Sequence, residues 1–195
     1  MPRLSSPLPV RLLALTGLVL AGACGRDEVA RSDFEASDEG WLLAGDADPR
    51  PELRAVGGNP GGHICGSDLN LGDVWYFVAP APFLGNASRA LHRRLTFDLK
   101  QSSIYNQVKG RDVVLQGSGY SLVYNLRATP GLDWTPYSVT LTASAGWKRD
   151  EPGFPDASDD ELATVLGALS ALRLRGEYVD GPDSACLDNV VLGVR

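Results

Sequence analysis

From residue 34 onward the chain is a succession of short alternating segments, and this pattern restricts the possible folds more than any other feature. In residues 93–99, the side chains of Leu95, Phe97 and Leu99 alternate with polar ones. A period of two is typical of strands that bury one face. Similar segments recur roughly every 10 residues and are separated by Gly- and Pro-rich turns, which predicts a β-sandwich or jelly roll.

The expected strands are rich in β-branched or aromatic residues and are bounded by turn residues. They cover residues 41–43, 63–65, 74–78, 93–99, 112–116, 120–126, 137–141, 172–179 and 186–194. The segment 117–119 (Gly-Ser-Gly) is predicted to join two of these strands as a hairpin turn.

One short amphipathic α-helix is predicted to interrupt the strand series. Ser158 and Glu161 have the spacing of a capping box at a helix N-terminus. The apolar residues that follow fall at i, i+3, i+4 and i+7, which places them on one face. They are Leu162, Val165, Leu166 and Leu169.

The first 23 residues have the pattern of a signal peptide and are not expected in the folded domain. Arg3 and Arg11 precede an apolar run over residues 12–20, and residues 21–23 are small, as at a cleavage site. The apolar run is shorter than the roughly 20 residues that a membrane-spanning helix needs.

Cys24 directly follows the predicted cleavage site. The junction resembles a bacterial lipobox, whose cysteine carries the lipid, although Ala21 stands where leucine is usual. The alternative is a secreted protein with an incidental cysteine. We therefore predict a lipid-anchoring membrane tether over residues 24–33 and one domain over residues 34–195.

Two further cysteines, Cys65 and Cys186, are separated by 121 positions. Export to an oxidising compartment favours a disulfide between them, with two independent buried thiols as the alternative. The formal net charge of −6 is not offset by a dense Lys/Arg cluster, which argues against a nucleic-acid partner.

Residues 73–85 resemble the W-x-F-x-A-P-x-x-F-L-G signature of the laminin B domain, also called laminin domain IV type A. The resemblance continues through Leu95-Thr-Phe97 to the closing Leu187-Asp-Asn-Val190. It runs from about residue 34 to residue 192, which is nearly the whole chain after the predicted signal peptide. The family often has Tyr-Gly before the L-x-F strand, whereas this chain has Ala-Leu-His-Arg at 90–93.

The resemblance implies an extracellular, all-β jelly-roll sandwich, similar to carbohydrate-binding modules and galactose-binding-like domains, and it supplies no catalytic motif. We therefore predict a non-enzymatic, lipid-anchored module at the cell envelope or surface that binds a glycan or an envelope or matrix component. The alternatives are a structural envelope protein with protein contacts only, or a small secreted polysaccharide hydrolase.

Jelly-roll modules of the carbohydrate-binding kind often hold a structural Ca²⁺ between the start and the end of the domain. Glu35 and Asp188 are the carboxylates at those places in the predicted fold. Calcium takes six to eight oxygen ligands, so carbonyl groups would have to complete the shell. The alternative is that Glu35 is solvated and Asp188 accepts hydrogen bonds from nearby backbone N–H groups.

Trp147 lies in a loop between glycine and charged residues and is the best candidate among the four tryptophans for stacking on a sugar ring. The alternative is packing at the core or its rim. Trp41, Trp75 and Trp134 are expected to pack, because they adjoin or lie in strands.

Overall fold

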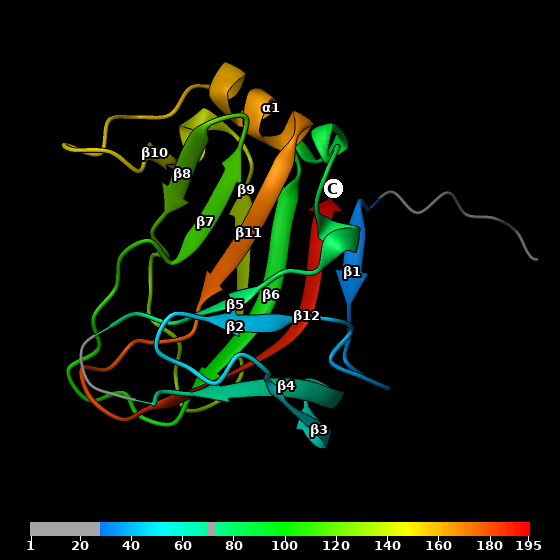
Figure 1. The fold of residues 1–195 in the computed structure, drawn as a ribbon, viewed down its shortest axis with the longest axis vertical. Helices are drawn as coiled ribbons and strands as arrows, with labels where there is room; N and C mark the ends of the chain where they lie inside the picture. Colours follow the sequence, from blue (N-terminus) through cyan, green and yellow to red (C-terminus); the bar gives the residue numbers. More distant parts are fainter. Residues whose placement is uncertain (1–27, 70–72) are drawn as a thin grey trace, which may run out of the picture.

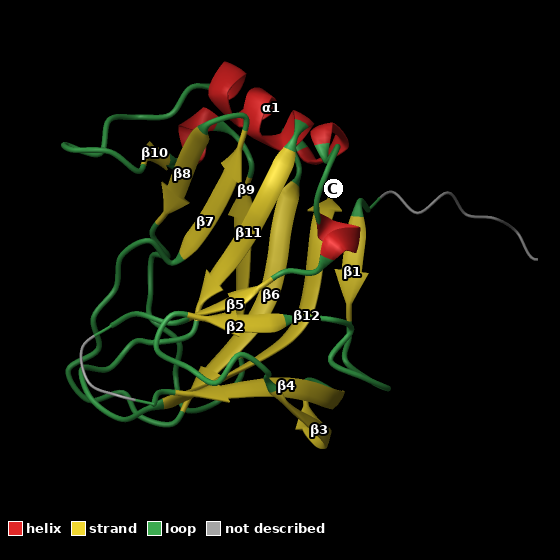
Figure 2. Ribbon diagram, in the orientation of Figure 1, coloured by secondary structure: helices red, strands yellow, loops and turns green. Residues whose placement is uncertain are grey.

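Two antiparallel sheets lie face to face in the computed structural model, which describes residues 28–69 and 73–195 (Figure 1). Apart from short 3-10 turns, the single α-helix described in those residues covers one end of the sheets (Figure 2). The predicted β-sandwich with one short helix is confirmed.

Sheet A has six strands, in the order β3-β4-β12-β6-β9, and β1 pairs with β12 beyond the end of β4. Its strands are β1 (Ala30–Ser32), β3 (Glu52–Gly58), β4 (Gly61–Ser67), β6 (Arg94–Gln101), β9 (Thr135–Thr140) and β12 (Ser184–Val194).

Sheet B also has six strands, in the order β10-β8-β7-β11-β5-β2. Its strands are β2 (Leu42–Ala44), β5 (Tyr76–Val78), β7 (Val113–Gly117), β8 (Tyr120–Tyr124), β10 (Lys148–Arg149) and β11 (Leu169–Arg175). The turn between β7 and β8 consists of Ser118 and Gly119, which both have positive φ, as a two-residue type I′ hairpin requires.

The core forms where the inward faces of the two sheets meet. Leu95, Phe97 and Leu99 of β6 are at most 1% exposed, as their alternation predicts. From sheet B, Leu115 and Leu172 occupy opposite positions in the β7–β11 pair and are fully buried. Burial of this apolar surface is the main favourable term in folding.

The indole of Trp75 fills a space that only glycine leaves open. A Cβ atom at Gly176 would lie 2.1 Å from the Trp75 ring, and one at Gly66 would lie 2.7 Å from it. Strand β11 covers Leu169–Arg175, so the predicted strand over 172–179 begins three residues earlier and ends at Arg175. Leu169, which was predicted on the helix face, is the first residue of this strand.

Helix α1 (Asp159–Gly167) begins at the predicted capping box. The Ser158 side chain accepts a hydrogen bond from the Glu161 N–H, and the Glu161 carboxylate accepts one from the Ser158 N–H. Leu162, Val165 and Leu166 are fully buried beneath the helix. Short 3-10 turns cover Ala81–Phe83, Ser88–Ala90 and Ala143–Ala145.

In the N-terminal half, one expectation was wrong and one strand was not predicted. Residues 30–32 do not belong to a tether, because they form β1 and pair with residues 190–192 of β12. The Trp41 indole N–H donates to Ser32 Oγ at 2.9 Å, which ties β1 to the core. Strand β3 was not predicted because its first six residues are all exposed and show no buried face.

The predicted signal peptide (1–23) and the predicted lipid site at Cys24 lie outside the described residues. Within the described part of the chain, no helix has the length and hydropathy that crossing a bilayer requires.

Candidate ligand-binding groove and carboxylate cluster

An open groove of about 620 Å³ follows one edge of the sandwich, where β9 of sheet A faces β8 of sheet B. Its lining combines two tyrosines, Tyr124 and Tyr137, with polar side chains that include Arg127, Thr135 and Ser138. Aromatic faces with a few convergent polar groups are typical of sites for small ligands and sugars.

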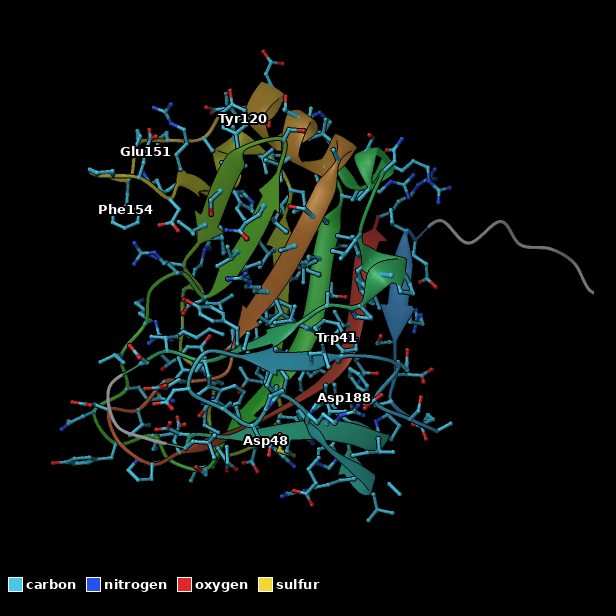
Figure 3. The ribbon with its side chains drawn as sticks, viewed as in Figure 1. Trp41, Asp48, Tyr120, Glu151, Phe154 and Asp188 are labelled. Atoms are coloured by element: carbon cyan, nitrogen blue, oxygen red, sulfur yellow. A yellow bond between two sulfur atoms is a disulfide. The ribbon has the colours of Figure 1, made fainter. Side chains whose placement is uncertain are left out.

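A second hollow of about 430 Å³ shares Tyr124, Arg127 and Ala145 with the first and adds Lys148 and Phe154. We call the two hollows together the β8–β9 groove. Figure 3 shows Phe154 on the loop that projects beside β10. Phe154 is 42% exposed, and its ring centroid lies 4.9 Å from the Arg111 guanidinium carbon, so the groove ends at an aromatic surface.

Tyr137 is held in one orientation at the floor of the groove. Its ring packs 5.3 Å from that of Phe97, and its hydroxyl donates to the Ala128 carbonyl at 3.1 Å. Burial raises the pKa of Tyr137, so the phenol stays protonated at neutral pH. A side chain already fixed in this way loses little conformational entropy when a ligand binds.

Trp147 does not lie on the surface, and the prediction that it is exposed for stacking was wrong. The side chain is fully buried, its Nε1 donates to the Thr140 carbonyl at 2.9 Å, and its ring lies 5.4 Å from that of Tyr124. The indole therefore packs in the core against Tyr124, which was the alternative expected for it.

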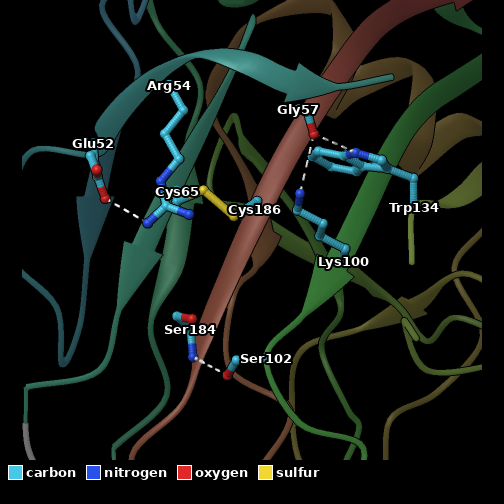
Figure 4. Close-up of a disulfide and its surroundings, with 9 residues drawn as sticks. All are labelled: Glu52, Arg54, Gly57, Cys65, Lys100, Ser102, Trp134, Ser184 and Cys186. Carbon is cyan, nitrogen blue, oxygen red and sulfur yellow. Dashed lines mark hydrogen bonds and ion pairs between the residues drawn. A yellow bond between two sulfur atoms is a disulfide. The ribbon is translucent and has the colours of Figure 1, made fainter. Parts of the chain in front are cut away.

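Trp134 lies on the outer face of sheet A, beside the disulfide (Figure 4). Its Nε1 and Lys100 Nζ both donate to the Gly57 carbonyl, at 3.0 and 3.2 Å, and Nζ lies 4.4 Å from the indole centroid. These contacts fix the half-buried indole against the β3–β4 hairpin, in agreement with the predicted packing role.

Three carboxylates converge where the β3–β4 hairpin meets β12. Asp188, labelled in Figure 3, is fully buried and lies directly opposite Asp98 of β6 in the sheet register. An extra residue on β12 forms a bulge here, with Asn189 at positive φ. Glu35 reaches the same hairpin, since a Cβ atom at Gly61 would lie 1.9 Å from its Oε1.

Amide groups hold these carboxylates. Asp188 accepts the backbone N–H groups of Asn59 and Asn189, at 2.6 and 2.7 Å. Asp98 Oδ2 accepts the side-chain amides of the same two asparagines, at 3.0 and 2.9 Å. The alternative expected for Asp188, bonding to nearby N–H groups, is therefore present.

Electrostatics at this cluster is unfavourable for three negative charges. The pKa of Asp188 is raised to about 6, mainly by burial and in smaller part by the charges of Asp98 and Glu35. The N–H donors of Asn59 and Asn189 oppose it. None of the three carboxylates forms an ion pair with a Lys or Arg among the residues that the structure describes.

The predicted disulfide between Cys65 and Cys186 is present, with an S–S distance of 2.06 Å between directly paired residues of β4 and β12. His63 lies next to it, and these three residues are the only His/Cys/Asp/Glu trio with ligand atoms within 4.8 Å in the described residues. Because the two sulfurs are bonded to each other, this trio is not a metal-ligand set.

The residues that line the β8–β9 groove were not identified from the sequence as site residues. Tyr137 was predicted only as part of an alternating strand, and Tyr124 only as part of the hairpin strand over residues 120–126. Arg127, in the loop after β8, carries no motif at all. The sequence offered only one signal for this groove, which was a tyrosine on each of two predicted strands. Those strands belong to different sheets, so the two tyrosines come together only when the sheets pack.

The fold is that of the carbohydrate-binding jelly rolls. The family 11 carbohydrate-binding module of Clostridium thermocellum, in complex with a β-1,3-1,4-mixed-linked tetrasaccharide, superposes with a TM-score of 0.57. It is 18% identical, and the match covers 84% of this chain and 94% of that one. The L4b domain of human laminin alpha-2 gives a TM-score of 0.53 at 14% identity, over 62% and 70% of the two chains.

Residues 76–194 match the family described as Laminin B (Domain IV), and the chain belongs to this family. Laminin subunit gamma-2 of Equus caballus is 32% identical over 137 residues, and that of Homo sapiens is 35% identical over 123 residues. These matches cover 65% and 62% of this chain but only 10% of either laminin subunit.

Proposed function

We propose that this chain is an extracytoplasmic binding and adhesion module that receives a glycan chain in the β8–β9 groove. The observation that carries the proposal is the groove itself, in which the rings of Tyr124 and Tyr137 lie among hydroxyl groups and Arg127. Sugar C–H faces suit aromatic rings, and sugar hydroxyls suit short polar side chains. Support also comes from the glycan-bound module of the same fold.

The groove is open along its length, which favours a segment of a polymer over a small enclosed molecule. Its lining runs over Thr135–Thr140 of β9 and continues through Arg127 toward Phe154. The formal net charge of the chain is −6, so a neutral polysaccharide suits the protein better than a strongly acidic one, which would be repelled.

The test is binding of the purified domain to a glycan array, followed by titration calorimetry on the best ligand. We expect Arg127→Ala and Tyr137→Ala to weaken binding at least about tenfold, equivalent to ~1.4 kcal/mol. The matched controls are Arg89→Ala and Tyr105→Ala, whose side chains are exposed away from the groove. Equal affinity for groove and control variants would refute the assignment of the site.

A protein partner is the second candidate. β9 is the last strand of sheet A, so its outer edge is open to strand addition from an envelope or matrix protein. Pro136 lies within β9 and removes one N–H donor, which limits the length of such an added strand. A pull-down that is insensitive to polysaccharide but lost on Ser138→Pro would favour this candidate over glycan binding.

We also propose a structural Ca²⁺ at Glu35 and Asp188. The support is that the carboxylates of Glu35 and Asp98 raise the pKa of Asp188 and that none of the three has an ion-pair partner among the described residues. Both oxygens of Asp188 also accept backbone N–H groups, so an ion would have to use their remaining lone pairs. Bound Ca²⁺ would supply the positive charge, and oxygen ligands are its preference. The melting temperature should be higher in the presence of calcium than in the presence of EDTA. Asp188→Asn should abolish this difference.

Lipid anchoring at Cys24 and export across the inner membrane complete the proposal. The small-residue junction before Cys24 supports it, and two acyl chains suffice for stable attachment to a membrane surface. Intact mass of the protein isolated from membranes should show a diacylglycerol adduct on Cys24. Release of Cys24→Ala into the soluble fraction is expected, and retention of this variant in membranes would contradict the anchor.

A further inference from the structure

The disulfide of sheet A has a buried histidine beside it. His63 and Cys65 occupy alternate positions of β4, so their side chains point to the same face of the sheet. Cys186 lies directly opposite Cys65 on β12. One ring nitrogen of His63 and both sulfurs lie within 4.8 Å of one another, and all three residues are at most 6% exposed. Three side chains of the types that bind zinc therefore converge at one point.

His63 is buried without a polar partner. The residue is 1% exposed, and neither Nδ1 nor Nε2 forms a hydrogen bond. Its ring meets that of Trp134 edge to face, with 5.3 Å between the centroids, and a Cβ atom at Gly57 would lie 3.6 Å from its Cε1. A buried polar group normally has a partner, because an unpaired one costs free energy. A cation bound between this ring and the sulfurs would supply that partner.

Charged side chains surround these three residues. Lys100 lies opposite Cys186 on β6, and Arg54 lies opposite the histidine on β3 (Figure 4). Cations beside a cysteine stabilise the thiolate, which is the form that binds metals. Glu52 lies opposite Cys65 and accepts a hydrogen bond from Arg54 at 2.8 Å. Its carboxylate is therefore the acid that the strand register places beside the cysteines, where a fourth ligand is needed.

We infer that the chain binds Zn²⁺ through His63, Cys65 and Cys186 once a dithiol has opened the disulfide. The dithiol supplies two electrons and two protons, the S–S bond breaks, and the dithiol is oxidised to a disulfide. Zn²⁺ then replaces the proton of each thiol, so that two Zn–S bonds form and two protons are released. Zn–S bonds of about 2.3 Å place tetrahedral ligands roughly 3.5–3.8 Å apart. The sulfurs reach this separation by side-chain rotation, and the histidine is already within range.

Opening the bond leaves the frame of the site in place. β4 and β12 stay paired through their backbone hydrogen bonds, and the histidine packs against Trp134, which does not depend on the sulfurs. The closed bond and the zinc site exclude each other, because a sulfur bonded to sulfur is not a thiolate. Neither the β8–β9 groove nor the anchor at Cys24 takes part, so zinc binding and glycan binding can fail independently.

The experiment is a metal titration of the full chain carrying Cys24→Ala, which removes the third thiol. One sample stays oxidised, and the other is opened with dithiothreitol, which is then removed under nitrogen. Co²⁺ is the first probe, because its visible bands and its thiolate charge-transfer band report the ligands, and Zn²⁺ then displaces it. We expect one Co²⁺ with thiolate ligands per reduced chain and no thiolate band in the oxidised chain. Zn²⁺ should raise the melting temperature of the reduced chain by roughly 5–10 °C at a hundredfold excess over Kd.

Two variants in the same background identify the ligands. His63→Gln should weaken Co²⁺ binding by the reduced chain at least about tenfold, or ~1.4 kcal/mol, and shift the visible bands. Cys65→Ala/Cys186→Ala should remove the thiolate band. The matched control is His92→Gln, which changes an exposed histidine and should leave binding unaltered.

Equal affinity of the two histidine variants, or a reduced chain without a thiolate band, would overturn the assignment. A reduced chain that unfolds and that Zn²⁺ does not refold would also overturn it, because the site requires the paired strands.

Discussion

Removal of the Cys65–Cys186 bond tests how far one cross-link supports this sandwich. We consider the double variant Cys65→Ala/Cys186→Ala. The bond closes a loop of 121 residues, and the chain-entropy relation gives about 5 kcal/mol of stabilisation for that length. Measured values for native disulfides are about 2–5 kcal/mol, because the unfolded chain retains some structure.

The folded state should change little in this variant. Both cysteines are buried, at 3% and 6% exposure, and their strands remain hydrogen-bonded through β4 and β12. The effect therefore arises mainly in the unfolded state. We expect a fall of about 2–5 kcal/mol in the free energy of unfolding, or about 4–20 °C in melting temperature for a domain of this size.

The assay is equilibrium denaturation in guanidinium chloride, with Cys24→Ala as the control that removes a cysteine outside the bond. The m-value of the double variant should also increase, because the unfolded chain is no longer constrained and exposes more surface. A loss below about 1 kcal/mol with an unchanged m-value would refute the reasoning.

Three further predictions concern single side chains. Ser158→Ala should lower the free energy of unfolding by about 1 kcal/mol through loss of the α1 cap, measured by chemical denaturation, whereas no loss would contradict the capping role. Trp147→Phe should cost about 1 kcal/mol through loss of the bond to Thr140 and leave glycan affinity unchanged, so a tenfold loss of affinity in calorimetry would reinstate Trp147 as a ligand contact. Burial, followed by the charges of Lys100 and Arg54, lowers the pKa of His63, and the charge of Glu52 opposes this effect. The unfolded chain therefore binds a proton at His63 at a higher pH than the folded chain does. The free energy of unfolding should fall as the pH drops below about 6.5. Between pH 7.5 and pH 5.5, the free energy of unfolding should decrease less for His63→Gln than for the unaltered chain. Equal decreases, measured by chemical denaturation, would contradict this role of His63.

Where a strand has one inward face, the sequence pattern correctly predicted which side chains are buried. The alternation of Leu95, Phe97 and Leu99 predicted their side, because side chains of a strand point to opposite faces in turn. Strand β3 could not be found in this way, since it has no buried face over residues 52–57. Strand β1 was missed because three residues are too few to show a period, and its place depends on pairing with β12.

Local chemistry along the chain determined the strand pattern, the hairpin at Ser118-Gly119 and the cap at Ser158, because each depends on neighbours within a few residues. Tertiary structure alone decided that Trp147 is buried, that Tyr124 and Tyr137 share a groove, and that Asp98 faces Asp188. It also decided that Glu177 and Asp183 are buried. These placements depend on strand order and sheet packing, which bring together residues that are far apart in the chain. A local sequence pattern carries no information about such long-range contacts.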